Sequence, residues 1–153
     1  MPIKSFKGLL NTTGTIDVIN LHTNTGSTGY RIVKFEVMPA QFWNDDYEST
    51  VQIFKVRKTS PVDAAGNQVI DFSDQTLIGA AIWSSRGSSE SYAEDKQIVF
   101  DNEIFNQDIY INYDETKTNN GINYYIELEQ VKLALDENTV ATLKDIRNIE
   151  SNG

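Results

Sequence analysis

Hydrophobic and polar residues alternate along most of this chain, and the alternation is clearest in its last third. The segment Ile122–Leu135 places Tyr124, Ile126 and Leu128 on one face of a strand, because side chains two residues apart point the same way. The preceding segment, Ile104–Tyr113, is rich in β-branched and aromatic residues, which suit a pleated, half-buried surface. Both segments are therefore predicted to be strands.

The two segments are predicted to pair with each other as a hairpin across the polar residues Asp114–Gly121. Asn120–Gly121 would suit a two-residue turn, whereas a longer loop pairs apolar residues across the strands, for example Ile109 with Ile126. The longer loop is preferred, since each apolar cross-strand pair contributes roughly 0.2–1 kcal/mol. Towards the end of the second segment the apolar residues change face, which predicts a β-bulge or a strand break near Glu129–Lys132.

Other parts of the chain show similar patterns between turn residues. In the segment Tyr30–Met38, the side chains of Val33, Phe35 and Val37 are predicted to face the interior. Near the C-terminus, apolar residues between Val140 and Ile149 recur every third position, which predicts at most one short helix. The further predicted strands are Ile3–Leu10, Thr15–His22, Tyr30–Met38, Thr50–Lys58, Gln68–Phe72, Thr76–Trp83 and Gln97–Phe100. Of these, Thr76–Trp83 is nearly all apolar, which predicts a central strand covered on both faces.

The number and spacing of these segments predict the class of fold. About nine short strands with at most one helix indicate an all-β protein. We predict an antiparallel β-sandwich with jelly-roll-like topology, formed as one domain over residues 1–153. A chain of this length buries roughly 68–70% of its unfolded surface, so its core needs no cross-links.

Composition narrows the possible partners and chemistry. A formal net charge of −9 argues against nucleic acid and anionic membranes as partners. The absence of cysteine excludes disulfides, thiolate nucleophiles and cysteine-bound zinc. Residues Met1–Lys7 contain no apolar core of a signal peptide, and no run approaches the roughly 20 apolar residues of a membrane helix.

The sequence contains little that indicates catalysis, and no cofactor or metal site is predicted. His22 is the single histidine and is expected at the surface, and no nucleophile-elbow motif is present. Glu127 and Glu129 lie roughly 6.5–7 Å apart on one strand face, a spacing near that of inverting glycosidases. Any strand gives that spacing, and because the opposite face of the strand is apolar, both glutamates are expected to face solvent. Acidic loops that could bind calcium but lack its motifs are Asn44–Asp46, Asp71–Asp74, Asp101–Glu103 and Asp114–Glu115.

Aromatic residues in loops are the stronger candidates for contact with a partner or ligand, because such side chains anchor interfaces and stack on sugars. The competing interpretation is that Trp83 belongs to the core and that Trp43 plugs one end of the sandwich. The candidate contact residues are Phe42, Trp43, Tyr47, Trp83, Arg86 and Tyr92.

Several segments carry a resemblance to a known family. Phe100–Tyr110, Asn123–Glu129 and Thr139–Asn148 resemble a small virion protein of marine tailed bacteriophages, including phages that infect cyanobacteria. Tyr30–Pro39 and Ile53–Val56 fit the same pattern, so the similarity spans most of the chain. These are structural segments, and the resemblance carries no catalytic residues.

The resemblance implies a non-enzymatic component of the virion, assembled in the host cytoplasm. The first expectation is a capsid decoration or cement protein that binds capsid subunits, with loops such as Ala40–Tyr47 and Ser84–Tyr92, or the termini, as contacts. A homo-oligomer is expected, a trimer by analogy with other decoration proteins. The alternative is a tail-associated or adhesin-like carbohydrate-binding β-sandwich. The third hypothesis is a hydrolase that uses Glu127 and Glu129.

Overall fold

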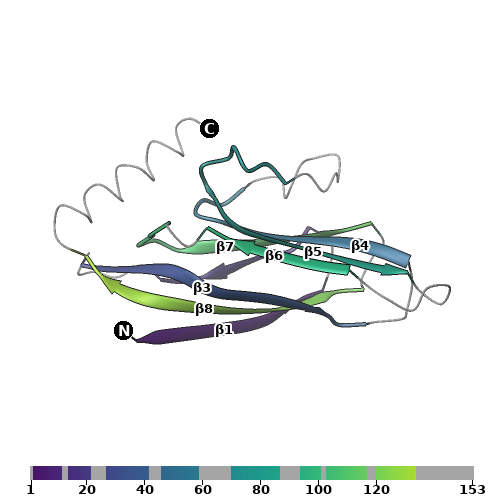
Figure 1. The fold of residues 1–153 in the computed structure, drawn as a ribbon, viewed down its shortest axis with the longest axis horizontal. Helices are drawn as coiled ribbons and strands as arrows, with labels where there is room; N and C mark the ends of the chain where they lie inside the picture. The colour runs from purple at the N-terminus through teal and green to yellow at the C-terminus, as the bar shows by residue number, and fades with distance from the viewer. Residues whose placement is uncertain are drawn as a thin grey trace.

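The computed structural model describes residues 2–11, 14–21, 27–41, 46–58, 70–86, 94–100, 103–116 and 120–133. Within these residues eight strands and no helix occur, and the strands form two antiparallel sheets packed face to face (Figure 1). The predicted all-β sandwich is therefore confirmed, whereas its jelly-roll topology is not confirmed. The predicted C-terminal helix lies outside the described residues.

The two sheets differ in size. One has three strands and the other has five, and β3 and β6 lie at the edges where the two sheets approach each other. In order, the three-stranded sheet contains β1 (Ile3–Leu10), β8 (Ile122–Lys132) and β3 (Thr28–Pro39). The five-stranded sheet contains β2 (Ile16–Ile19), β7 (Ile109–Glu115), β4 (Asp46–Phe54), β5 (Leu77–Arg86) and β6 (Glu94–Val99).

The predicted hairpin between the last two strands is wrong. β7 pairs with β2 and β4, whereas β8 pairs with β1 and β3, so the two strands belong to opposite sheets. The chain crosses from one sheet to the other between Glu115 and Ile122, with Gly121 at a φ of 80°. A left-handed conformation of this kind favours glycine, because it has no Cβ.

The predicted inward face of β8 is confirmed, but the predicted bulge is misplaced. Tyr124, Ile126 and Leu128 have exposed fractions of 7%, 0% and 0%. The register of β8 runs without a break through Glu129–Lys132, and the shift lies opposite, in β3, between Ile32 and Lys34. The extra residue there is Val33, which is 39% exposed instead of facing the interior.

The core fills the space between the sheets. Residues of both sheets contribute to the core, and most of these core side chains are buried from solvent. A strand was predicted at Gln68–Phe72, but the described part of this segment, Ile70–Phe72, forms no strand. Fully buried aliphatic and aromatic side chains include Leu10, Ile32, Val51, Ile53, Ile109, Ile111, Tyr113, Ile122, Ile126 and Leu128.

A close contact in the three-stranded sheet makes a first prediction. A Cβ at Gly8 would lie 2.8 Å from the Tyr124 hydroxyl, and that hydroxyl donates a hydrogen bond to Asp17 Oδ2 at 3.2 Å. Gly8→Ala must therefore displace a buried ring, and overpacking of this kind costs about 1–3 kcal/mol. Chemical denaturation measures the loss. Ile3→Ala, at a position 50% exposed on the same strand, is the control expected to change little, and equal stability of the two variants would contradict the close contact.

Candidate functional site

The structure describes only part of the predicted contact set. Phe42, Trp43 and Tyr92 lie outside the described residues. Arg86 ends β5 opposite Asp46, and its side chain is not described. His22 also lies outside the described residues. The remaining two candidates, Tyr47 and Trp83, fall on neighbouring strands.

Tyr47 and Trp83 lie on the inner face of the five-stranded sheet. Tyr47 is 2% exposed and its hydroxyl donates a hydrogen bond to the Gln41 carbonyl at 3.1 Å. Trp83 is partly buried and packs against the core. Neither side chain forms an exposed platform for a ligand, and for Trp83 the core interpretation is the better one.

These two residues belong to a group of buried polar side chains at one end of the sandwich interior, which we call the polar end cluster. Glu115, 5% exposed, is its charged member. Its carboxylate oxygens accept hydrogen bonds from the Asn120 backbone N–H at 3.0 Å and from Asn120 Nδ2 at 3.1 Å. The carboxylate thus holds the chain where it crosses between the sheets. The cluster comprises Tyr47, Ser49, Trp83, Tyr113, Glu115 and Asn120.

The phenols of the polar end cluster are held in their neutral form. Burial, followed by the negative charge of Glu115, raises the pKa of both Tyr113 and Tyr47. The Tyr113 hydroxyl faces Glu115 and Ser49, yet it makes no hydrogen bond of standard geometry within the described part of the chain. Neutral phenols buried beside a carboxylate that Asn120 already engages suit a structural role better than that of a base or a nucleophile.

The glutamate pair considered for hydrolysis lies on the outer face of the three-stranded sheet. Glu127 accepts a hydrogen bond from the Tyr125 hydroxyl at 2.7 Å. Glu129 accepts one from Arg31 Nε at 3.0 Å and forms an ion pair with the same guanidinium. Each carboxylate is therefore engaged by a neighbouring side chain on that sheet.

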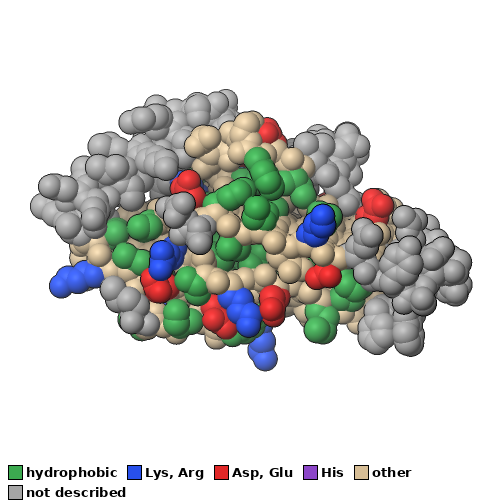
Figure 2. Space-filling view, in the orientation of Figure 1, with side chains coloured by type: hydrophobic (Ala, Val, Ile, Leu, Met, Phe, Trp, Pro, Cys, Tyr) green, Lys and Arg blue, Asp and Glu red, His purple; other side chains and the backbone are tan. Residues whose placement is uncertain are grey.

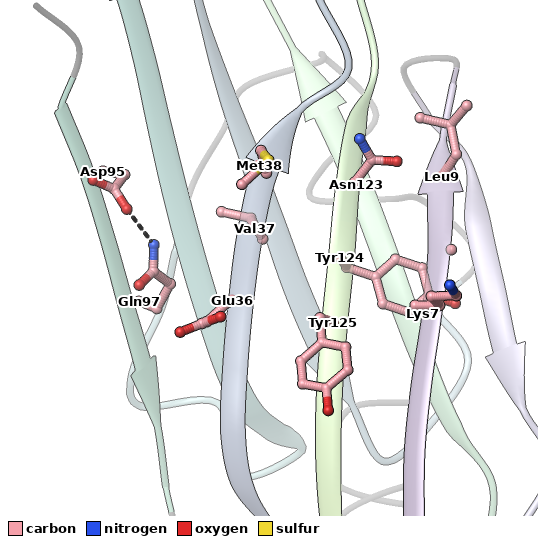
Figure 3. A pocket seen from close by; sticks show the side chains of 11 residues that line it. Lys7, Leu9, Glu36, Val37, Met38, Asp95, Gln97, Asn123, Tyr124 and Tyr125 are labelled. Carbon is pink, nitrogen blue, oxygen red and sulfur yellow. Dashed lines mark hydrogen bonds between the residues drawn. The ribbon is translucent and has the colours of Figure 1, made fainter.

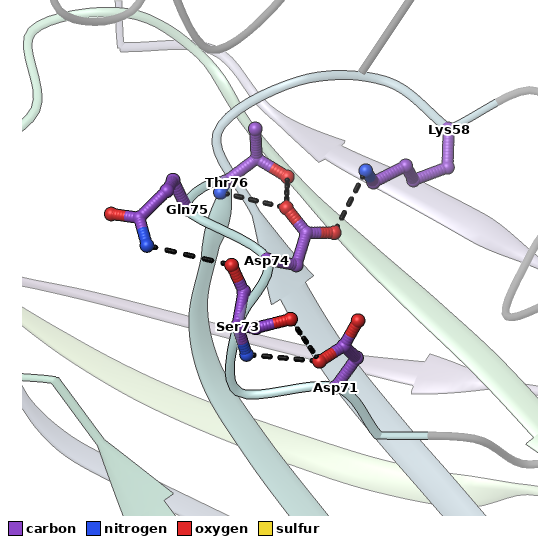
Figure 4. A network of polar contacts seen from close by, with 6 residues as sticks. All are labelled: Lys58, Asp71, Ser73, Asp74, Gln75 and Thr76. Carbon is purple, nitrogen blue, oxygen red and sulfur yellow. Dashed lines mark hydrogen bonds and ion pairs between the residues drawn. The ribbon is translucent and has the colours of Figure 1, made fainter. Parts of the chain in front are cut away.

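The acidic loop Asp71–Asp74 is built as a turn (Figure 4). Asp71 Oδ1 accepts hydrogen bonds from the backbone N–H and the hydroxyl of Ser73, at 2.9 and 2.6 Å, which lower the pKa of Asp71. Asp74 Oδ1 accepts the equivalent pair from Thr76, and Asp74 Oδ2 lies 2.9 Å from Lys58 Nζ. Burial opposes these contacts, but together they lower the pKa of Asp74.

The other acidic loops are only partly described. Asp114 and Glu115 are the buried last residues of β7, and Glu103 forms an ion pair with the buried Lys55 at 3.5 Å. No group of three or more potential metal ligands occurs among the residues that the structure describes. Turn formation and ion pairing therefore account for the carboxylates of Asp71, Asp74 and Glu103.

A hydrophobic surface that the sequence did not reveal covers part of the outer face of the five-stranded sheet, and we call it the apolar strip. Phe72, Ile82 and Ile98 are 58%, 41% and 44% exposed. With Ile70 and Ala80 they line a groove of 420 Å³, and Figure 2 shows hydrophobic side chains gathered on this side of the molecule. The only sequence signal was the apolar run of β5, which had been interpreted as a strand covered on both faces.

A second concavity, of 760 Å³, lies on the outer face of the three-stranded sheet, and we call it the trough (Figure 3). It is lined by residues of β1, β8 and β3 and bounded by the edge strand β6. Its surface is mixed, with amide, carboxylate and ammonium groups beside two tyrosine rings and several aliphatic side chains, and the buried Tyr124 and the partly buried Val37 contribute to its floor. The residues that line it are Lys7, Gly8, Leu9, Glu36, Val37, Met38, Asp95, Gln97, Asn123, Tyr124 and Tyr125.

Comparison with known proteins identifies no relative. No family model, no curated protein and no solved structure matches this chain. In the described parts of the chain, no helix is long and apolar enough to cross a membrane. Among the residues that the structure describes, the apolar strip and the trough are the surfaces best suited to contact a partner or a ligand.

Proposed function

We propose that this chain is a non-enzymatic virion structural protein, a decoration or cement protein that binds the outside of a phage shell. The apolar strip is the observation that carries the proposal. Large contiguous apolar side chains on an exposed sheet face are typical of surfaces that another protein covers. The resemblance to small phage virion proteins supplies the identity of the partner.

The mechanism is burial of the apolar strip against neighbouring shell subunits. Phe72 is fixed by an edge-on contact with the ring of Phe100, with centroids 5.2 Å apart, so it loses little conformational freedom on binding. Ile82 and Ile98 lie beside it, and Lys96 and Gln97 form a polar rim. A stable contact of this kind buries more than about 1,000 Å² in total, so other parts of the chain and copies of itself take part.

The carbohydrate-binding alternative loses support at its proposed residues. Tyr47 is 2% exposed and Trp83 packs against the core, so neither presents a ring to a sugar. Trp43 lies outside the described residues. Sugar binding by aromatic side chains of the loops is therefore not the preferred hypothesis.

The first test is the location of the chain. Phage particles purified from the lysate in which the chain is made are expected to carry it in many copies. Mass spectrometry of gradient-purified particles measures this. Abundance in the lysate together with absence from intact particles would contradict the proposal.

The second test concerns the apolar strip itself. Ile82→Ser combined with Ile98→Ser is expected to weaken binding to particles stripped of this chain by roughly tenfold or more, since hot-spot side chains each contribute more than about 1 kcal/mol. Val18→Ser is the matched control, because Val18 is 36% exposed and pairs with Tyr110 at the opposite edge of the same sheet. Equal binding by both variants would show that the strip is not the contact.

A further inference from the structure

We infer that the trough on the three-stranded sheet is a binding site for a neutral oligosaccharide. This inference does not rest on the proposed function, since Tyr125 of the trough lies on the three-stranded sheet and is no part of the apolar strip on the five-stranded sheet. The two surfaces meet at Gln97 of the edge strand β6.

The ring of Tyr125 provides a flat apolar surface in the trough. Figure 3 shows the ring lying along β8 with its face turned outward. Its hydroxyl is held by Glu127 at 2.7 Å, and Lys34 Nζ lies over the ring, 5.9 Å from its centroid, so a sugar contacts the part of the ring that this side chain leaves open. Aromatic rings that are fixed in this way contact the C–H face of a sugar, while the hydroxyl and nearby donors contact its polar edge.

Hydrogen-bonding groups surround the ring on three strands. Asn123 lies two residues before Tyr125 on the same face, and Glu36 is directly opposite Tyr125 in β3. At the edge strand, Gln97 Nε2 donates to Asp95 Oδ2 at 2.7 Å, which orients both side chains. Amide and carboxylate groups suit vicinal hydroxyls, because each presents two polar atoms side by side.

The balance of charge and apolar area selects the class of ligand. Glu36 and Asp95 outnumber Lys7 among the charged lining residues, which disfavours acidic sugars and nucleic acid. Leu9 and Met38, 48% and 68% exposed, supply further apolar contact. The volume of 760 Å³ falls within the about 300–1,000 Å³ of small-ligand sites and leaves room for several sugar rings.

A protein partner is the less favoured occupant of the trough. The lining alternates polar and apolar side chains, and ion pairs such as Arg31–Glu129 and Lys34–Glu36 are already formed on the same sheet face. Stable protein interfaces concentrate apolar side chains at their centre, an arrangement that the apolar strip has and the trough lacks.

The test is titration calorimetry of the purified full chain with neutral hexasaccharides: cellohexaose, laminarihexaose, xylohexaose, maltohexaose and chitohexaose. At least one is expected to bind. Tyr125→Ala is expected to weaken that binding by roughly tenfold or more, which corresponds to about 1.4 kcal/mol. Tyr125→Phe keeps the ring and is expected to retain most of the affinity.

Tyr110→Ala is the matched control, because Tyr110 also lies beneath a cation, with Arg57 Cζ 5.2 Å from its centroid, but on the other sheet. It is expected to bind normally. Absence of binding to all five sugars, binding only to an acidic hexagalacturonate, or equal affinity of Tyr125→Ala and wild type would each overturn the inference. Particle attachment should be unchanged in Tyr125→Ala, so this test and that of the proposed function fail independently.

Discussion

Replacing Ile126 with alanine is expected to lower the free energy of unfolding by about 2–5 kcal/mol, the usual cost of truncating a fully buried aliphatic side chain. Ile126 is 0% exposed at the centre of β8 and lies between two aromatic residues, Phe6 of β1 and Phe35 of β3. Three strands converge on this side chain, so the cavity cannot close by moving one neighbour. Against a total stability of about 5–15 kcal/mol, the loss is large.

Urea denaturation followed by circular dichroism measures this loss as a lower midpoint with an unchanged slope. Met38→Ala is the matched control, because it also truncates a large apolar side chain but at a position 68% exposed. It is expected to change the stability by less than about 0.5 kcal/mol, as is usual for surface positions. If both substitutions cost the same, β8 does not present Ile126 to the core.

The inward face of β8 could be predicted from the sequence because burial has a direct signature. Side chains alternate across a strand, so Tyr124, Ile126 and Leu128 had to share a face. The partners of the strand could not be predicted in the same way. Backbone hydrogen bonds do not depend on the side chain, and an inward-facing strand can pair with several neighbours. The hairpin prediction failed for this reason, since β7 and β8 face the same core from opposite sheets.

The surfaces on which function is argued were predicted least well. The apolar run of β5 was interpreted as covered on both faces, but Ile82 points outward near the sheet edge and is 41% exposed. The trough combines residues from β1, β3, β8 and β6, which lie far apart in the sequence. A single extra residue, Val33, also shifts which side chains of β3 point outward. Such combinations follow from sheet order, which alternation does not encode.

The burial of Glu115, the charged member of the polar end cluster, was also not predicted from the sequence. Glu115 had been assigned to a polar loop, because acidic residues are almost never fully buried unless they are paired. The structure places it in β7 with Asn120 as its partner. A buried carboxylate beside two phenols has a consequence that can be measured, because it changes how the stability of the protein depends on pH.

Stability is expected to fall steeply above pH 10. Burial, then the charge of Asp17, raises the pKa of Tyr124 to about 12, and burial with the charge of Glu115 raises that of Tyr113. In the unfolded chain these phenols titrate at their ordinary value of 10.0. Above that pH the unfolded chain loses protons that the folded chain keeps, so unfolding becomes more favourable. Each phenol contributes roughly 1.4 kcal/mol per pH unit between the two pKa values.

The stabilising contribution of each phenol is therefore complete below pH 10, and that of Tyr124 is lost as the pH rises towards 12. With Tyr113 and Tyr124 both affected, the loss over this range approaches the lower end of the about 5–15 kcal/mol that stabilises a typical protein. Alkaline unfolding, followed together by circular dichroism and tyrosinate absorbance, is expected to be cooperative. Ionisation of the buried phenols should coincide with loss of structure and not precede it.

Tyr113→Phe separates this effect from the other alkaline titrations of the chain. The hydroxyl makes no hydrogen bond of standard geometry among the described residues, so its removal should leave stability at neutral pH within about 1 kcal/mol of wild type. Above pH 10 the free energy of unfolding of Tyr113→Phe should then fall less steeply with pH than that of wild type, because one fewer phenol loses its proton on unfolding. Tyr110→Phe, which removes a partly exposed phenol on the outer face of β7, is the matched control for the loss of a phenol at the surface. Identical alkaline slopes for wild type and Tyr113→Phe would mean that this phenol is accessible to solvent and that the end of the sandwich interior is open.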